Sequence, residues 1–284
     1  MVAQWANQLS LAGTFSWGLH RKPPAGFEEK MQNRHKTAGY LYFLADLFTL
    51  LLEAGIYFAS LSGPLYLLWR LKPAHPLTVL PLVIVGWLAS GSIFILILVL
   101  LKRLVVGDVS PGRFFLTSRK AYAWMAGTRL VQILIRSPFH ALVNENAFFR
   151  HLFYRGMGAD VHSTLLLGNR VKIPDPWFIK AGRHVHIGDE AVISGHKVEH
   201  NTVTLDWVEI GDNVLIGARA IVFPGVKVGN GAIVGAASVV ARGTLIPAGE
   251  TWSGNPARKV DPFELPNTFS PAKQIATKEG SRVS

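Results

Sequence analysis

The sequence predicts a chain of two unlike parts, apolar helices that cross a membrane followed by a parallel β-helix. Two observations predict it: a run without charged residues at 79–101, and an apolar residue that recurs every six positions from Ile210 to Ile246. Charged residues make up 17% of the chain, against about 25% in an ordinary soluble domain, while hydrophobic residues reach 49%. With a net charge of +11, this composition favours a membrane protein over a disordered chain or a nucleic-acid binder. The absence of cysteine excludes disulfides, thiolate catalysis and Cys-ligated metals.

The run at 79–101 is the clearest membrane span. At 1.5 Å per residue it is long enough to cross a hydrocarbon core of about 30 Å, and it lacks the polar face that a buried core helix shows. A second span is predicted at 48–68, where Glu53 is the one charged residue. Asp46 shares a helix face with Glu53. This favours packing against the other span, or a place near the headgroups, over a charged substrate path.

The distribution of Lys and Arg predicts the orientation of the spans. The connecting loop, 70–77, carries only Arg70 and Lys72, whereas two basic residues follow the second span directly. The aromatic and basic arm before the first span, 1–39, carries five more: Arg21, Lys22, Lys30, Arg34 and Lys36. By the positive-inside rule both ends of the chain face the cytoplasm, and the arm lies along the cytoplasmic surface. We therefore expect a multi-pass protein of a bacterial plasma (inner) membrane, with the β-helix on the cytoplasmic side.

Residues 102–156 are predicted to form basic helices at the membrane surface. Nine Lys or Arg residues in 102–155 stand against two acids, Asp108 and Glu145. Apolar side chains are interleaved with the basic ones: Trp124, Met125, Leu130, Ile133 and Leu134. Because the segment follows a span directly, we expect helices that rest on anionic lipid with these side chains in the interface. A solvated basic face packed on its neighbours is the alternative.

The second half of the chain has a period of six. The recurring apolar positions are Ile210, Ile216, Val222, Val228, Val234, Val240 and Ile246. A second apolar position lies four residues after each of the first four, at Val214, Ala220, Val226 and Ala232. An α-helix does not place every sixth residue on one face, and a flat strand would show a period of two, whereas a three-sided coil of strands and tight turns points each of these residues inward. Stacked coils then bury a continuous core.

Upstream the repeat is less regular. Six-residue steps link Ile187 with Ile193, and also Leu167, Ile173 and Ile179. The step from Ile193 to Ile210 is 17 residues rather than a multiple of six, and the segment His196–Trp207 inside it is rich in His, Glu and Asp. We predict a loop there that protrudes from a coil, since loops on a rigid scaffold often carry the chemistry of a protein.

The repeats and their ending resemble the hexapeptide-repeat acyltransferases. The closing motif is formed by Gly254, Pro256, Ala257, Arg258 and Lys259 in WSGNPARKV. This resemblance implies a left-handed β-helix, a thioester donor, either acyl-CoA or a carrier-bound thioester, and a homotrimer. Three further segments, 102–112, 172–182 and 194–211, are similar to the C-terminal membrane domains of polylysine-synthetase-type peptide synthetases. In that family membrane helices flank acyltransferase-like modules that join amino acids.

The resemblance to acyltransferases implies acyl transfer to a hydroxyl or amine. The predicted anchoring in the lipid bilayer favours a membrane-associated or peptide-like acceptor, since a soluble acceptor would not require it. No adenylation or carrier domain is recognisable in the sequence, which favours acyl transfer without a synthetase. Two alternatives stay open: a peptide-bond-forming partner module of a nonribosomal peptide synthetase, and a non-catalytic β-helix scaffold. We expect a membrane domain at 1–156, the β-helix at 157–260 and a disordered tail at 261–284.

Acyl transfer needs a base that takes a proton from the acceptor, and histidine suits this role. His196 occupies the position where the resemblance places the histidine of the family. His200 is the next candidate, and Glu199 is able to orient a histidine or hold an amine. Asp175 matches an acidic position of the synthetase-like modules, although an Asp between prolines is also a common turn residue.

Two kinds of ligand site are considered. Four histidines permit a zinc site, namely His184, His186, His196 and His200, but their spacing does not match the three-histidine arrangement of the gamma-class carbonic anhydrases, so no metal is expected. If the donor is acyl-CoA, its arm should run beside the later coils over small residues: Gly217, Ala218, Gly235 and Ala236. Arg258 and Lys259 would meet its phosphates. The alternative is that the small residues form tight corners and the basic pair is solvated.

Overall fold

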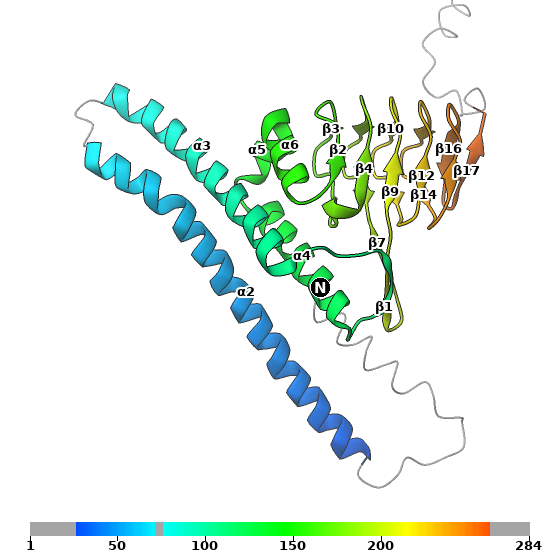
Figure 1. Cartoon of the computed structure of the whole chain (residues 1–284), viewed down its shortest axis with the longest axis horizontal. Coiled ribbons are helices and arrows are strands. Elements are labelled where there is room, and N and C mark those ends of the chain that lie inside the picture. The colour runs from blue at the N-terminus through cyan, green and yellow to red at the C-terminus, as the bar shows by residue number, and fades with distance from the viewer. Residues whose placement is uncertain (1–26, 72–75, 262–284) are drawn as a thin grey trace, which may run out of the picture.

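The computed structural model describes residues 27–71 and 76–261, with side chains described from 46 and from 79 onward in these two ranges. Two long helices form an antiparallel pair, α2 (Phe27–Leu71) and α3 (Pro76–Leu101), followed by shorter helices and a stack of strands (Figure 1). The predicted surface arm falls mostly, and the predicted tail almost wholly, outside the described residues. We call α2 and α3 the apolar hairpin.

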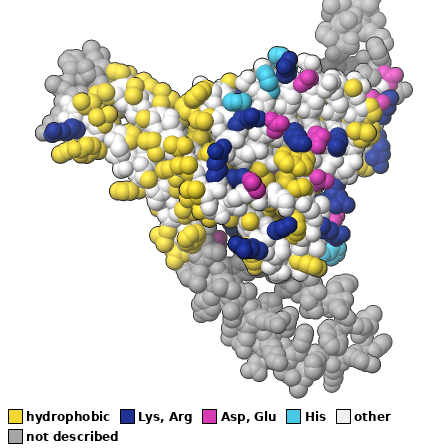
Figure 2. All heavy atoms as spheres, in the orientation of Figure 1, with side chains coloured by type: hydrophobic (Ala, Val, Ile, Leu, Met, Phe, Trp, Pro, Cys, Tyr) yellow, Lys and Arg dark blue, Asp and Glu magenta, His cyan; other side chains and the backbone are white. Residues whose placement is uncertain are grey.

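Two stretches of the apolar hairpin are long and apolar enough to cross a membrane, Asp46–Leu71 and Val79–Val106. They contain the predicted spans, and the second continues through the π-helical turn η1 (Lys102–Val106). Large apolar side chains such as Phe58, Trp69 and Leu80 are more than half exposed, and apolar side chains gather over this part of the molecule (Figure 2). The described part of the chain leaves this surface uncovered.

The opposite side of α3 packs against the short helices α4 (Arg119–Arg136), α5 (His140–Glu145) and α6 (Ala147–Gly156). Phe94 is fully buried, with its ring centroid 5.1 Å from that of Phe139. Gly91 allows the close approach of Leu142. Asp46, which the sequence placed on a packing or headgroup face, lies 3.9 Å from Arg129 of α4. This partner belongs to α4 rather than to the other span, so the packing of the acidic face against α3 stays a prediction.

The prediction that residues 102–156 rest on lipid through interleaved apolar side chains is wrong for most of those side chains. Four of the five are buried within the protein: Trp124, Leu130, Ile133 and Leu134. Trp124 contacts residues of the β-helix, and α4 as a whole packs against α3, η1 and α5, so this helix uses its apolar face for protein packing. The segment also contains a strand that was not predicted, β1 (Gly112–Phe115).

The strands from residue 160 onward form a three-sided β-helix with one parallel sheet on each side. The first sheet has the order β15 (Leu245–Ile246), β12 (Lys227–Val228), β9 (Val208–Ile210), β4 (Ile179–Ala181) and β2 (Asp160–Val161). The second has the order β17 (Ala257–Val260), β16 (Thr251–Gly254), β13 (Ile233–Val234), β10 (Leu215–Ile216), β5 (His186–Ile187) and β3 (Leu166–Leu167). The third has the order β14 (Val239–Val240), β11 (Ile221–Val222) and β6 (Val192–Ile193).

The six-residue repeat is confirmed by register and burial. Ile210, Val228 and Ile246 stack in the first sheet, and the intervening positions Ile216 and Val222 stack in the other two. Every position of the predicted six-residue series from Ile210 to Ile246 is buried, as are the four predicted second positions. Within the three sheets of the β-helix, over the residues that the structure describes, every pairing is parallel except that between β16 and β17, which close the last coil. The hand of the coil stays a prediction.

The repeat is interrupted at one corner in two successive coils. In the first of these two coils, the short helix η2 (Pro176–Phe178) adds residues before β4, so that Ala181 rather than Ile179 pairs with Ile210. The expected six-residue step from Ile173 to Ile179 is therefore wrong in phase, although both residues are buried. In the next coil, between β6 and β9, the chain leaves the prism altogether.

The segment predicted as a protruding loop is a β-hairpin. It consists of β7 (His196–Glu199) and β8 (Thr202–Leu205), which pair antiparallel. Strand β1 pairs with the free side of β8, giving an antiparallel sheet of order β1-β8-β7. The chain changes from helices to β-helix strands between α6 and β2. Strand β1 lies in the helical part of the sequence, yet it pairs with β8 of the later part. The predicted domain boundary at residue 156 therefore stays a prediction.

Candidate active site

The two interruptions of the repeat bring Asp175 and His196 together. Asp175 precedes η2 in the lower coil, and His196 begins β7 in the coil above. The Oδ2 atom of Asp175 lies 2.5 Å from Nδ1 of His196. The Asp175 side chain is fully buried, while a quarter of the His196 side chain is exposed. We call these residues the His–Asp pair.

The buried carboxylate of Asp175 receives further donors. The backbone N–H of Gly195 donates to Oδ2 at 3.1 Å, and the indole Nε1–H of Trp124 donates to Oδ1 at 2.6 Å. A buried ionised carboxylate is costly unless it is hydrogen-bonded, and here both oxygens accept. These contacts tie the side chain of Asp175 to His196. Its backbone carbonyl accepts from the Phe178 N–H at 3.0 Å, so Asp175 is also the turn residue that the other interpretation expected.

His196 is held in one orientation by its neighbours. The indole ring of Trp124 packs on the imidazole with 4.8 Å between ring centroids, and Ser194 Oγ lies 3.2 Å from Nδ1. Because an ionised carboxylate only accepts hydrogen bonds, the nitrogen that faces Asp175 carries the proton. The other nitrogen, Nε2, then has a free lone pair. A carboxylate that fixes the histidine tautomer in this way is the arrangement of a general base.

Two other predicted catalytic residues lie elsewhere. Glu199 is at the far end of β7, about 10 Å along the strand from His196 at 3.3 Å per residue, and its carboxylate pairs with Lys197 at 2.8 Å. The hydrogen bond and charge of Lys197 hold the pKa of Glu199 below its ordinary value. His200 is exposed in the turn of the β-hairpin, with a φ of 51°. The structure therefore does not bring Glu199 or His200 to the His–Asp pair.

Two residues of the site escaped the sequence interpretation as functional candidates. Trp124 was noted only as an apolar residue of a basic segment, and Ser194 was not singled out. No spacing links Trp124 to Asp175, because α4 belongs to the helical region and Asp175 to the β-helix. A contact between such distant segments has no periodic signal in the sequence.

No group of three metal-ligating side chains comes together among the described residues. His184 lies in a turn and its backbone N–H donates to Thr164 Oγ1 at 2.8 Å, while His186 is exposed on β5. His196 is already bound to Asp175. The four histidines considered for zinc are therefore spread over the second sheet, its corner and the β-hairpin.

The small residues predicted to admit a donor lie at the corners of the coils. A Cβ atom on Gly217 would overlap the backbone of Ala236, and one on Gly235 would come within 2.6 Å of Ser253 Oγ. Close stacking of successive coils thus already accounts for both glycines. Ala218 and Ala236 are exposed one coil apart on the same corner.

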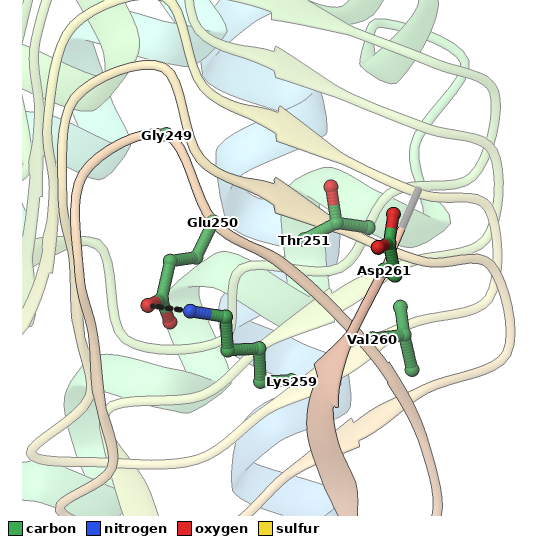
Figure 3. A pocket seen from close by; sticks show the side chains of 6 residues that line it. All are labelled: Gly249, Glu250, Thr251, Lys259, Val260 and Asp261. Atoms are coloured by element: carbon green, nitrogen blue, oxygen red, sulfur yellow. Dashed lines mark hydrogen bonds and ion pairs between the residues drawn. The ribbon is translucent and has the colours of Figure 1, made fainter. Parts of the chain in front are cut away.

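The basic pair predicted to meet phosphates lies on the last strand. Lys259 forms an ion pair with Glu250 at 2.6 Å, and Arg258 is exposed. Lys259 and Glu250, but not Arg258, line a pocket together with Gly249, Thr251, Val260 and Asp261, and their ammonium and carboxylate groups face each other there (Figure 3). Hydrogen bonds from Lys259 and Trp252 hold the pKa of Glu250 below its ordinary value. The pocket belongs to the last coil, whereas the β-hairpin leaves an earlier one (Figure 1).

Comparison with known proteins identifies the repeat. Residues 208–242 match the family model described as the hexapeptide repeat of succinyl-transferase. Residues 208–242 are therefore similar to a hexapeptide repeat. The predicted resemblance to hexapeptide-repeat transferases is confirmed by this match, which covers β9 to β14.

The chain is also similar to a delta-poly-L-ornithine synthetase of Acinetobacter baumannii (strain AB307-0294). The two are 24% identical over 160 residues, which cover 56% of this chain and 12% of the synthetase. The chain thus spans a small fraction of the length of this curated relative. The similarity agrees with the predicted resemblance to polyamino-acid synthetases.

Solved structures of hexapeptide-repeat acetyltransferases are among the structural neighbours. A maltose O-acetyltransferase from Clostridium difficile 630 is 19% identical, with 54% of this chain and 93% of that chain covered and a TM-score of 0.42. A galactoside acetyltransferase in complex with coenzyme A is 21% identical, with coverages of 56% and 88% and a TM-score of 0.38. A hexapeptide-repeat acetyltransferase from Vibrio cholerae is 21% identical, with coverages of 51% and 93% and a TM-score of 0.38.

Proposed function

We propose that this chain is a membrane-anchored acyltransferase that uses His196 as a general base. The observation that carries the proposal is the His–Asp pair, a histidine with one nitrogen bound to a buried carboxylate and a side chain that is partly exposed. It lies on a hexapeptide-repeat β-helix, and the matching family model describes a transferase repeat. A base on this scaffold fits acyl transfer better than a purely structural role, because a structural histidine does not need a fully buried carboxylate.

The proposed reaction moves an acyl group from a thioester to a hydroxyl or amine. Nε2 of His196 takes the proton of the acceptor as its oxygen or nitrogen attacks the thioester carbonyl. The resulting imidazolium is stabilised by Asp175. When the carbon–sulfur bond breaks, the imidazolium gives its proton to the leaving sulfur. The products are an ester or amide and a free thiol, and His196 returns to its starting form.

The donor is proposed to be acyl-CoA or a carrier-bound thioester. The exposed corner at Ala218 and Ala236 leaves room beside the backbone for an extended arm, and Arg258 is exposed for a phosphate. Gly217 and Gly235 would contribute to this path indirectly, because they allow successive coils to stack closely at the corner. Lys259 would have to break its ion pair with Glu250 to reach a phosphate. No resident metal is proposed.

The membrane anchor is proposed to be the apolar hairpin. Its support is the length of the two apolar stretches and their exposed Phe, Leu and Trp side chains. Basic residues at both of its outer ends favour a cytoplasmic β-helix at a bacterial plasma membrane. An anchored enzyme gains most when its acceptor is also bound to the membrane, so we propose a lipid-linked, glycan or peptide-like acceptor.

A homotrimer is part of the proposal. The outward row of the second sheet, apolar apart from the exposed His186, runs in register from Leu166 through His186 to Leu215 and Ile233. Its three apolar side chains are 54%, 40% and 38% exposed. The first sheet instead presents Glu209 between Lys180 and Lys227. The apolar row favours contact between copies through the second sheet. Light scattering of the detergent-purified protein, corrected for bound detergent, measures this directly.

The test of the proposed function is His196→Ala, with His200→Ala as the matched control. Both variants remove an imidazole from the β-hairpin, but only His196 contacts Asp175. We expect thioester cleavage with an added amine or alcohol acceptor to fall at least about 100-fold in His196→Ala, the usual size of a general-base effect, and to change little in His200→Ala. Equal turnover in both variants would remove His196 as the base.

A second candidate function is supported by the similarity to the poly-ornithine synthetase. In this role the chain would join an amine to an aminoacyl thioester carried by a separate synthetase, with the same base. Supplying aminoacyl thioesters on CoA and on a carrier protein separates the two functions by the preferred donor. A chain that binds neither donor, yet forms a stable complex with another protein, would instead be a scaffold.

A further inference from the structure

We infer that Trp124 is a positioning residue for the His196 base, so that the helical region completes the site on the β-helix. The inference deepens the proposed function and rests on it for its kinetic consequence. Trp124 belongs to α4, which precedes the first β-helix strand, whereas the His–Asp pair belongs to two later coils. Its indole nevertheless contacts both members of the pair.

The contacts of Trp124 are of two kinds. Its Nε1–H donates to Asp175 Oδ1 at 2.6 Å, and its ring packs on the imidazole of His196 at 4.8 Å between centroids. Trp124 is 5% exposed, so water does not compete freely for either contact. One side chain thus fixes the carboxylate and forms a wall for the histidine.

The donor from Trp124 matters because of how Asp175 is bound. Oδ2 accepts from Gly195 and from His196, while the bond that Oδ1 receives within the described part of the chain comes from Trp124. Without this donor, Oδ1 is a buried acceptor with an unmet hydrogen bond, which favours rotation of the carboxylate. Rotation weakens the bond to Nδ1 and with it the tautomer that leaves Nε2 free.

The position of Trp124 is set by the packing of α4. This helix begins after Ser118, whose side chain accepts from the Ala121 N–H, and it packs against α3 and η1. On its far side Arg129 faces Asp46 of α2. The apolar hairpin, α4 and the His–Asp pair therefore form one connected series of contacts.

Trp124→Phe tests the inference, with Trp177→Phe as the matched control. Both changes replace an indole by a benzene ring at a buried site, and Trp177 is two residues from Asp175. The difference is that Trp177 Nε1 has no hydrogen-bond partner within the described part of the chain. We expect kcat to fall about 10-fold in Trp124→Phe with KM nearly unchanged, the effect of losing one hydrogen bond to a charged group. Trp177→Phe should keep most of the activity.

A rescue variant separates the hydrogen bond from the ring contact. The pyrrole ring of tryptophan and the imidazole ring of histidine attach at equivalent atoms, so Trp124→His places Nε2–H where the indole Nε1–H was. We expect Trp124→His to recover part of the activity that Trp124→Phe loses. Thermal melting checks that each variant is folded, and the comparison is restricted to those that melt cooperatively.

A spectroscopic readout tests the inference even if the proposed function fails. An imidazole N–H bound to a buried carboxylate gives a low-field proton NMR resonance, which His196→Ala assigns by its loss. We expect the resonance to weaken or move in Trp124→Phe, to return in Trp124→His, and to persist in Trp177→Phe. An unchanged resonance in Trp124→Phe, or equal kcat in the two Phe variants, would overturn the inference. A normal resonance pattern in a protein without thioester activity would reject the proposed function alone.

Discussion

Asp175 is the residue on which the chemical proposal depends most. Replacing it with Asn keeps the size of the side chain but offers His196 Nδ1 an amide, which favours the opposite tautomer. We expect kcat of Asp175→Asn to fall by about 10⁴-fold, the size of the same change in a Ser-His-Asp triad. Steady-state kinetics with a thioester donor measures this. Asp160→Asn is the control, since Asp160 is exposed and pairs with Arg155; a similar loss in both variants would contradict the prediction.

His140 predicts a pH dependence of stability. Burial lowers the pKa of His140, and the charge of Glu145 opposes this only in part. The pKa of His140 is about 6.5 in the unfolded chain and lower in the folded one. As the pH falls through about 6.5, the unfolded chain therefore binds a proton more readily than the folded chain does, and the free energy of unfolding decreases. Between pH 7.5 and pH 5.5 we expect the melting temperature of His140→Gln to fall by less than that of the unchanged protein. An equal loss in both would show that other groups set the dependence.

At the residue scale, the sequence identified both members of the His–Asp pair but not their contact. His196 and Asp175 stood out through a resemblance, each on its own segment. Their contact depends on η2. The extra residues of η2 change the corner of one coil so that Asp175 lies next to the start of the β-hairpin of the following coil. Trp124 could not be predicted in this role, because a buried indole in an amphipathic helix has the same pattern whether or not it donates to a carboxylate.

The corners of the coils carry a prediction at the scale of the element. Gly217→Ala places a methyl group against the backbone of the next coil at Ala236, so we expect a loss of about 1–3 kcal/mol in the free energy of unfolding, as for other overpacked sites. Thermal melting of the detergent-purified protein measures it, with Ala218→Ser at the exposed neighbouring position as control. If Gly217→Ala melts normally but raises KM for the donor, the predicted cofactor contact accounts for this glycine instead.

Elements with a strong local pattern were predictable, and elements without one were not. The two long apolar helices follow from the length of their apolar runs, and the coils follow from the six-residue step, which states which residues must be buried. Strand β1 is four residues long, and its partner β8 is some ninety residues away. The sequence around Gly112–Phe115 contains no information about that partner, so the strand and the true nature of the protruding segment emerge only from tertiary pairing.

The orientation of the whole molecule can be measured because the chain has no cysteine. In cells, we expect Lys72→Cys in the loop between the spans to react with a membrane-impermeant maleimide added from outside. Leu245→Cys, at an exposed position of β15, should react only after the membrane is opened. Reaction of both from outside, or of neither, would contradict two spans with a cytoplasmic β-helix.

The pairing of β1 with β8 has a consequence for the order of synthesis. The apolar hairpin, β1 and α4 leave the ribosome long before residues 202–205, so β1 has an unpaired edge until the β-hairpin has been made. The same interval separates the synthesis of Trp124 from that of His196. Under the proposed function, a nascent chain would therefore be anchored first and complete its site late, and in the interval a helper protein that covers the edge of β1 would protect it from pairing with other chains.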